Sequence, residues 1–451
     1  MTDHCFYDSL VDYAETNPLR LHMPGHKGKG MPMEEWNALA PLDVTELAPT
    51  GNLYGSDDWL EDSQRRWAWE WGMDSAFYCT GGSTQGLFTL FSLFTQPGDT
   101  ILMDRVSHKS IHNAMALLDL HPVWLNRPWD MAQCIHKAVQ PEEVERLLTE
   151  HPEATAVVLT TPTYYGILTP LEEICDICRR HGVRLLVDGA HGAHLPLVLD
   201  KKQNCLLGHN PYINCDGVTV STHKTLPAPG QTAVVMANRV TMAEIRRASA
   251  LTSTTSPSFA MMAALDKLCS CMWKIREQYR PVVEWCAEMR RRYPPVTGEW
   301  LDPCRLVFQV ENGERLSKRL QDMGIYPEME DRHHVVAILT AADTEDDVRR
   351  LARALNFYNY KDKAPYEAHL EAPPMPERTM SPRAARFAPA GKCQLERAVG
   401  RTVAEVIAPY PPGVPVVSPG EVIDKKILAY LYDLCYDKSD TVLVTKETAK
   451  Q

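Results

Sequence analysis

The chain has 451 residues, of which 44% are hydrophobic and 23% charged, and its formal net charge is −11. Such a chain is long enough for two or three domains with a large buried core. The acidic balance argues against nucleic acid as a partner, and no apolar run approaches the roughly 18 residues that a membrane span needs.

The N-terminus and the cysteines both favour a cytoplasmic protein. Residues 1–20 do not show the charged-then-apolar layout of a secretory signal. Thirteen cysteines are scattered without a disulfide-like spacing, which suits a reducing compartment. Cys175 and Cys178 form one CxxC in a predicted helix, where thiols three residues apart share a face. Since no second pair follows at zinc spacing, we expect no metal site.

Short apolar runs alternate with helical patterns between about residues 75 and 240. The apolar runs that predict strands lie at 100–106, 155–162, 183–192, 216–222 and 232–237. The periodic stretches that predict helices lie at 83–96, 109–120, 141–151 and 171–182. This alternation predicts an α/β domain with a mainly parallel sheet. The strands are apolar throughout, which is typical of a sheet covered on both faces.

The rest of the chain predicts three further parts. A long helical stretch covers 259–293, and residues 306–358 predict a small α+β unit. A proline-rich segment at 360–385 predicts a linker or an ordered crossing segment, and the tail predicts a final helix. We therefore divide the chain into an N-terminal segment at 1–50, a large domain at 51–293, a small α+β domain at 294–358, and a linker with a C-terminal region at 359–451.

Polar side chains collect where the predicted strands end. Arg105 and His108 follow one strand, Asp188 and His191 follow another, and Lys224 follows a third. Ligands of open α/β sheets bind at the carboxyl ends of the strands, so we expect these residues to form one site. Taken singly, Asp188 could also cap a helix and both histidines could be structural.

The stretch CTGGSTQGLFTL predicts a turn that binds an anion. Gly82 and the glycine before it let the backbone come close to a ligand, and Ser83 and Thr84 open a helix whose amides face outward. The Gly-Lys-[Ser/Thr] ending of a Walker loop is missing. An ordinary helix N-cap is the alternative interpretation.

A lysine amine, an anion cradle and a buried carboxylate are together what a pyridoxal 5'-phosphate site requires. Lys224 is expected to form the Schiff base, the turn at Ser83 to hold the phosphate, and Asp188 to keep the pyridine nitrogen protonated. Lys109 is the rival for the Schiff base. It lies beyond its strand at a helix start, so Lys224 is preferred.

Short motifs also follow one another along the chain in a recognisable order. They are LHMPGHKGKG at 21–30, DVTEL at 43–47, TGGSTQG at 80–86, DRVSHKS at 104–110, PTYYG at 162–166, VSTHKT at 220–225, STTSPSF at 253–259 and YPPGVPVVSPGE at 410–421. Over nearly the whole chain they resemble the Orn/Lys/Arg decarboxylases, pyridoxal-phosphate enzymes of the aspartate-aminotransferase fold. The resemblance implies a fold-type I α/β enzyme with a mainly parallel seven-stranded sheet in a large domain and a smaller α+β C-terminal domain. The chain resembles the short type of this family, without the N-terminal flavodoxin-like domain.

The resemblance assigns roles residue by residue. It implies Lys224 as the Schiff-base lysine, Asp188 as the partner of the pyridine nitrogen, and His108 as a catalytic ring stacked on the cofactor. The other implied cofactor-binding residues are Gly82, Ser83, Thr84, His191, Ser221 and His223, with Thr255 and Ser256 reaching the phosphate of a neighbouring subunit. Glu421 is expected to approach the distal cationic end of a substrate, and a plain helix cap is its alternative role.

Two positions depart from the family pattern. Gly189 stands where the family usually has Glu in Asp-Glu-Ala-His, and Thr80 stands where Asn is common at the start of the glycine-rich loop. Asp188 is kept, so cofactor binding is still expected, with a different fit around the ring.

The resemblance implies α-decarboxylation of arginine, lysine or ornithine to an amine and CO2, which feeds polyamine metabolism. The sequence does not choose among the three, because a carboxylate such as Glu421 can pair with an ammonium or a guanidinium. Lys224 and a nearby histidine both remain candidates for returning a proton to Cα. Another pyridoxal-phosphate reaction, such as transamination or elimination, and a non-catalytic relative are the alternatives.

The expected partners follow from the same resemblance. They are a small amino-acid substrate and further copies of the chain, in a homodimer or higher homo-oligomer with active sites at the subunit interface. Neither nucleic acid nor a membrane is expected as a partner.

Overall fold

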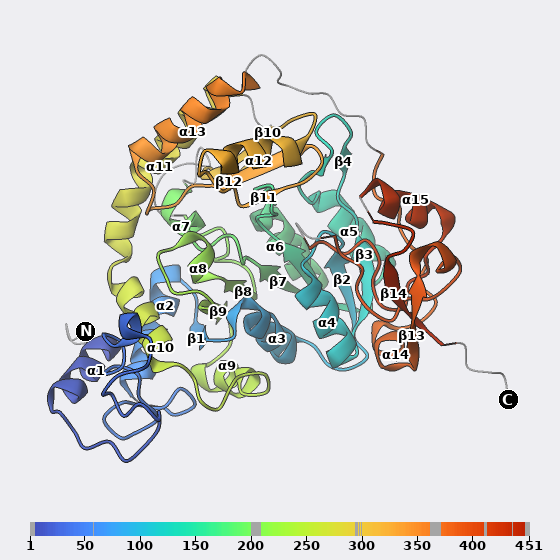
Figure 1. Cartoon of the computed structure of the whole chain (residues 1–451). Coiled ribbons are helices and arrows are strands. Elements are labelled where there is room, and N and C mark those ends of the chain that lie inside the picture. Colours follow the sequence, from blue (N-terminus) through green and yellow to red (C-terminus); the bar gives the residue numbers. More distant parts are fainter. Residues whose placement is uncertain are drawn as a thin grey trace. The chain divides into compact units, whose positions relative to one another are not determined.

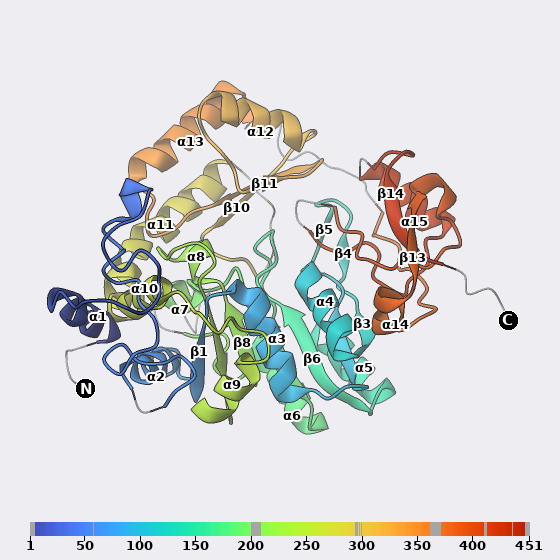
Figure 2. The same cartoon turned by 60° about the horizontal axis from the view of Figure 1, so that its bottom comes forward.

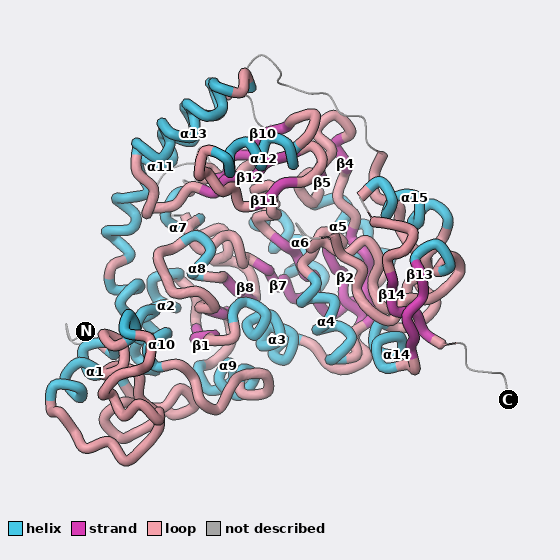
Figure 3. Tube along the Cα trace, in the orientation of Figure 1, coloured by secondary structure: helices cyan, strands magenta, loops and turns pink. Residues whose placement is uncertain are grey.

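Figures 1 and 3 show a computed structural model of the chain in which helices and strands alternate. The structure describes residues 5–56, 58–199, 209–293, 296, 298, 300–360, 371–409, 413–434 and 436–446. The chain divides into two compact units, one formed by 1–93 with 187–280 and the other by 94–186 with 281–451. No helix within the described ranges is long and apolar enough to cross a membrane.

The main sheet has seven strands in the order β1-β9-β8-β7-β6-β2-β3, which confirms the predicted fold class. The strand bounds are Ser75–Cys79 for β1, Thr100–Asp104 for β2, His121–Leu125 for β3, Ala154–Thr160 for β6, Arg184–Asp188 for β7, Gly217–Val220 for β8 and Ala233–Ala237 for β9. β2 pairs parallel with β3 and β6. β9 runs antiparallel to β1 and β8.

Helices surround the strands of the first unit. They are α1 (Phe6–Glu15), the 3-10 turn η1 (Glu34–Trp36), α2 (Trp59–Trp71), α3 (Gly82–Phe94), α7 (Leu195–Val198), α8 (Thr222–Thr225), α9 (Met242–Ser249) and α10 (Phe259–Ser270), and α11 (Met272–Arg292) begins here. The long helix predicted over 259–293 is therefore two helices, which separate at Cys271. Strands β1, β8 and β9 are buried along their whole length, as their apolar sequences predict.

The second unit places amphipathic helices beside its parallel strands. They are α4 (Lys109–Leu118), α5 (Pro141–Glu150) and α6 (Leu171–His181), and a hairpin of β4 (Trp129–Asp130) and β5 (Ile135–His136) lies between β3 and α5 in the sequence. Pro141 begins α5, and Gly182 ends α6 in the left-handed conformation that glycine tolerates. Cys175 and Cys178 are both buried on α6.

A small α+β layer follows in the same unit, as Figure 2 shows. Its antiparallel sheet has the order β10-β12-β11. The elements are β10 (Arg305–Gln309), α12 (Gly313–Asp322), β11 (Met329–Glu330), β12 (His334–Ile338) and α13 (Glu345–Phe357). Thr344 caps α13 in a reciprocal capping box with Asp347, which explains why the helix begins at Glu345.

The C-terminal region has its own apolar core within the second unit. Its elements are α14 (Pro382–Phe387), β13 (Ala390–Gln394), the 3-10 turn η3 (Leu395–Arg397), α15 (Lys425–Asp433) and β14 (Thr441–Thr445). Val403, Val417 and Ile427 are fully buried in this core. α14 lies beside α4 (Figures 1 and 2), and Arg383 donates a hydrogen bond of 2.7 Å to the carbonyl of Leu117.

Parts of two predicted features lie outside the described residues. These are 361–370 of the proline-rich segment and Tyr410, Pro411 and Pro412 of the C-terminal motif. The division of the chain into four regions stays a prediction.

Candidate active site

Lys224 lies just beyond the end of the buried strand β8. Ser221 precedes the four-residue helix α8, which carries Lys224 on its third residue. The Lys224 Nζ lies 3.1 Å from Nε2 of His191, within hydrogen-bonding distance. The contact places the amine and the imidazole next to each other beyond the end of β8.

Asp188 is the last residue of the neighbouring strand β7 and is 2% exposed. Its Oδ1 accepts a hydrogen bond of 3.1 Å from the backbone N–H of Ala190. The backbone of Gly189 donates to the carbonyl of Thr219, and that of Ser221 donates to the carbonyl of Ala190. These bonds hold the ends of β7 and β8 together, so the structure brings Asp188, His191 and Lys224 into one place within the first unit.

The TGGSTQG motif forms the turn from β1 into α3. Gly82 adopts a left-handed φ of 72° and begins the helix. Ser83 is buried, and its Oγ shares a hydrogen bond of 2.6 Å with Oγ of Ser221. The predicted anion turn and the predicted lysine motif are therefore in direct contact, although the two serines lie 138 positions apart.

Gly86 explains why the motif ends in a glycine. A Cβ at this position would lie 2.1 Å from Oγ1 of Thr219 on β8. Only a residue without a side chain lets α3 lie this close to the strand. The close packing fixes where the N-terminal amides of α3 stand relative to the end of β8.

The remaining cofactor-binding candidates of this unit lie around the same turn or on the surface. Nδ1 of His223 lies 2.8 Å from the carbonyl oxygen of Thr232, which directs the ring toward the start of β9. Thr84, Thr255 and Ser256 are exposed. The phosphate roles of these three residues stay predictions.

His108 lies in the second unit, where it caps the N-terminus of α4. Its ring accepts a hydrogen bond from the backbone N–H of Ser110, and its Nδ1 lies 2.8 Å from the Ser110 hydroxyl. His108 is half-buried. The stacking role of this ring stays a prediction.

Glu421 does not have the environment expected of a substrate ligand. Its side chain is 0% exposed and binds the guanidinium of Arg105 through two hydrogen bonds, of 2.7 and 3.0 Å. The backbone N–H of Ser418 also donates to Oε2 at 2.7 Å. Both oxygens are thus bonded inside the protein, and the contact of Glu421 with the cationic end of a substrate stays a prediction.

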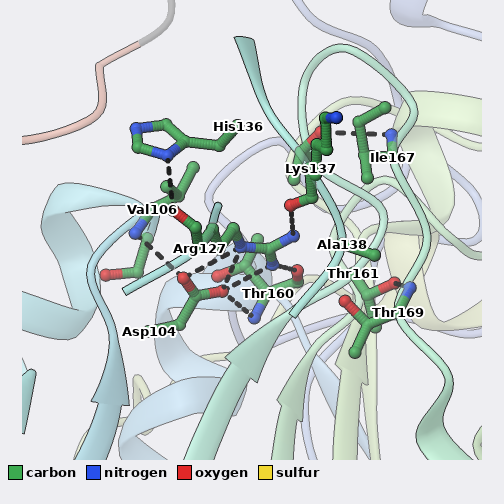
Figure 4. Close-up of polar contacts among 12 residues, drawn as sticks. Asp104, Val106, Arg127, His136, Lys137, Ala138, Thr160, Thr161, Ile167 and Thr169 are labelled. Carbon is green, nitrogen blue, oxygen red and sulfur yellow. Dashed lines mark hydrogen bonds and ion pairs between the residues drawn. The ribbon is translucent and has the colours of Figure 1, made fainter. Parts of the chain in front are cut away.

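A second buried ion pair was missed in the sequence, although Asp104 belongs to the DRVSHKS motif. Arg127 binds both carboxylate oxygens of Asp104, and neither side chain is exposed. The same carboxylate accepts from the backbone N–H of Val106 and of Thr160, as Figure 4 shows. Asp104 therefore ties the ends of β2 and β6 to Arg127, two residues after β3. The signal in the sequence was a charged residue, Asp104, at the end of an otherwise apolar strand, because a buried carboxylate needs a cation as its partner.

The first unit contains the chemical groups that pyridoxal phosphate needs. It contains the amine of Lys224 for the aldehyde and the buried carboxylate of Asp188 for the ring nitrogen. For the phosphate it contains the hydroxyls of Ser83 and Ser221 and the amides at the start of α3. Gly82 leaves the turn at the start of α3 without a side chain that would fill it. These residues fit a phosphate and a ring with an aldehyde and a basic nitrogen.

Comparison with known proteins agrees with this chemistry. Residues 4–301 match the family described as Orn/Lys/Arg decarboxylase, major domain, and residues 366–439 match its C-terminal domain. The chain is 27% identical to an arginine decarboxylase of Bacillus anthracis over 94% of this chain and 92% of that protein. An arginine decarboxylase of Bacillus subtilis is likewise 27% identical over 94% of this chain and 92% of its own.

Solved structures share the fold at lower identity. A lysine decarboxylase of Francisella novicida superposes with a TM-score of 0.81 at 18% identity, covering 98% of this chain and 81% of the other. The constitutive lysine decarboxylase of E. coli gives 0.81 at 19% identity, with 98% and 82% covered. A serine palmitoyltransferase structure with pyridoxal phosphate matches 66% of this chain and 77% of the other, with a TM-score of 0.53 at 16% identity.

The matched family regions cover most of the chain, and the site of the first unit carries the groups that the family's cofactor requires. The chain belongs to the Orn/Lys/Arg decarboxylase family, and it is a pyridoxal-phosphate-dependent decarboxylase of basic amino acids.

Proposed function

We propose that the chain decarboxylates arginine to agmatine, as a step that supplies polyamine synthesis. Sequence relatives that match over 94% of the chain are named arginine decarboxylases, and this observation carries the choice among the three basic amino acids. The lysine decarboxylases are below 20% identity and support the fold alone. A cytoplasmic location and a homodimer or higher homo-oligomer remain part of the proposal.

Within the site, we assign one role to each residue of the first unit. Lys224 supplies the amine that holds the cofactor, and Asp188 holds a proton at the pyridine nitrogen. Ser83 and Ser221 bind the phosphate together with the amides of α3. When bound, pyridoxal phosphate supplies the electron sink for the bond that breaks at the substrate Cα.

The pair of Lys224 and His191 is proposed to move the proton that the product needs. His191 is 5% exposed, and its Nε2 touches the lysine Nζ. A buried imidazole in this position can exchange a proton with the amine, so the pair can return a proton to Cα after CO2 leaves. His108 is proposed to stack on the cofactor ring. Thr255 and Ser256 are proposed to reach the phosphate of a second subunit, which suits their exposure.

Product analysis tests the proposal directly. The purified protein is supplied with pyridoxal phosphate and an equimolar mixture of arginine, lysine and ornithine, and amines are identified by mass spectrometry. Agmatine as the dominant product is the expected result. Cadaverine or putrescine instead would keep decarboxylation and overturn the substrate, whereas keto acids without any amine would overturn the reaction.

A further inference from the structure

The side chain of Gln85 holds the backbone of the turn that precedes α3. Gln85 is the fourth residue of this helix and is 5% exposed. Its Oε1 accepts a hydrogen bond of 2.9 Å from the backbone N–H of Gly81, the residue just before the helix. A Cβ on Gly81 would lie 2.9 Å from the same oxygen, so the glycine allows this close approach. Gln85 therefore occupies the Gly81 amide and fixes the direction in which the chain enters α3.

The nitrogen of the Gln85 amide reaches the segment that follows α9. This Nε2 donates a hydrogen bond to Oγ of Ser253, and that hydroxyl donates in turn to the carbonyl of Ser249 at 2.7 Å. Tyr54 holds the next residue from a different direction, since its hydroxyl donates a hydrogen bond of 2.6 Å to the carbonyl of Thr254. All of these contacts lie within the first unit. Ser253 is therefore a fixed anchor for the Gln85 side chain.

The entry into α3 determines where its first amides point. The first N–H groups of a helix have no partner inside the helix, and those of α3 are the amides proposed to bind phosphate. Their direction follows from the path of the chain before the helix, which the bond from Gly81 to Gln85 fixes. The contact between Ser83 and Ser221 joins two side chains and leaves the backbone before the helix free to rotate. The turn therefore depends on Gln85 for its backbone geometry.

We propose that Gln85 is a positioning residue, which fixes the glycine turn before α3 so that the helix amides meet the phosphate of the cofactor. The glutamine does so by joining Gly81 to Ser253, the first residue of the STTSPSF motif. This inference rests on the proposed binding of phosphate at the start of α3. It gives a role to the glutamine of the TGGSTQG motif and to the serine that opens STTSPSF.

A purely structural role of Gln85 would differ in which ligands it affects. If the glutamine only stabilised the fold, its loss would weaken every ligand of the site to the same extent. If it positions the turn, its loss weakens only a ligand that carries a phosphate group. Two ligands that differ in the phosphate alone therefore separate the two roles.

The test compares pyridoxal phosphate with pyridoxal, which has the same ring and aldehyde without the phosphate. Each is titrated into the full-length protein freed of cofactor, and the absorbance of the bound ligand gives the dissociation constant. Gln85→Met keeps the length of the side chain and removes both of its hydrogen bonds. We expect its dissociation constant for pyridoxal phosphate to rise by about tenfold, as for one lost hydrogen bond to a charged group. Its constant for pyridoxal should stay that of the wild type. Constants that are unchanged, or that rise equally for both ligands, would overturn the proposal.

Two further variants keep the result interpretable. Gln64→Met is the matched control, because Gln64 is 2% exposed, accepts from the backbone N–H of Tyr78 and donates to the carbonyl of Leu60. It should lower the melting temperature and leave the ratio of the two dissociation constants unchanged. If Gln85→Met does not fold, Ser253→Ala decides, because it removes one of the two bonds and keeps the other. A smaller rise, for pyridoxal phosphate alone, is then expected, and the absence of such a rise would contradict the positioning role.

The wild-type protein separates a failure of the proposed function from a failure of this inference. If it binds pyridoxal as tightly as pyridoxal phosphate, the proposed phosphate site is rejected. If it prefers pyridoxal phosphate and Gln85→Met keeps the same preference, the phosphate site stands and only the positioning role is rejected. Neither readout depends on turnover, so the result is independent of which amine the enzyme makes.

Discussion

At the scale of single residues, the two lysines that follow strands have different surroundings. Lys224 touches His191 beside Asp188, whereas Lys109 is exposed at the first position of α4. We expect Lys224→Ala to lose amine formation while keeping the far-ultraviolet circular dichroism of the wild type, because it removes the nucleophile without removing packing. Lys109→Ala is the control and should keep near wild-type turnover. The reverse pattern, measured by agmatine formation, would contradict the assignment.

Gly189 is one of the two positions at which the sequence departs from the family pattern, and its surroundings leave little room for a side chain. A Cβ at this position would lie 3.0 Å from Cγ2 of Val218 and 3.2 Å from the ring of Tyr212. Tyr212 is fully buried and stacks on Trp71 at 6.1 Å. The tyrosine thus occupies space that a larger side chain at 189 would need.

Gly189→Ala is therefore expected to destabilise the fold by about 1–3 kcal/mol through overpacking. It should also weaken cofactor binding, because Gly189 lies between Asp188 and the amide that binds it. Thermal unfolding and a cofactor titration measure the two effects. Gly230→Ala is the control, since that position has open space around it and an ordinary φ. Equal behaviour of the two variants would show that Tyr212 does not restrict the site.

At the scale of elements, the distance between α3 and β8 decides where the anion turn lies. Gly86→Ala brings a methyl group to within 2.1 Å of the Thr219 hydroxyl and must push α3 outward. We expect a loss of about 1–3 kcal/mol in stability and a rise in the dissociation constant of pyridoxal phosphate. Adding Thr219→Ala should restore part of both, because it removes the nearest atom and leaves the Cβ at 2.8 Å. Cofactor affinity that is unchanged in Gly86→Ala would separate the helix position from phosphate binding.

The sequence predicts most helices and strands well, but it does not predict which side chains from distant positions pair with one another. The apolar strands β2, β6, β7, β8 and β9, the helices α3 to α6 and the polar residues after β7 and β8 were predicted, because each depends on neighbours within a few positions, whereas β1 and β3 were missed. The pair of Ser83 with Ser221 and the pair of Arg105 with Glu421 join residues 138 and 316 positions apart. A single sequence carries no signal for such pairings, so neither pair was predicted.

At the scale of the whole molecule, buried histidines make stability depend on pH. Burial, with Arg127 nearby, lowers the pKa of His136 from 6.5 to about 4, while Asp104 opposes the shift. In the unfolded chain this histidine takes up a proton below about pH 6.5, whereas the folded chain resists protonation until the pH nears 4. Unfolding therefore takes up a proton in this window, and stability is lost as the pH falls through it.

His136→Gln removes this dependence at one site. The wild type should lose on the order of 3 kcal/mol between pH 6.5 and 4 from this group, and the variant should show a correspondingly flatter profile of denaturation midpoint against pH. His151→Gln is the control, because His151 lies at the surface beside Glu153. Parallel profiles for His136→Gln and the wild type would mean that the ring is already charged in the folded protein.

The buried pair of Arg105 and Glu421 has a consequence for how such a chain can be recombined. Its two members fall in the separate regions that match the family's major domain and C-terminal domain. Removing one member of a buried pair leaves a charge without compensation, which typically costs about 3–5 kcal/mol. A chimera that joins this major region to a foreign tail is therefore expected to be less stable where the tail brings no carboxylate to the same guanidinium. The two regions are separate stretches of sequence, but the stability of each depends on a charge that the other supplies.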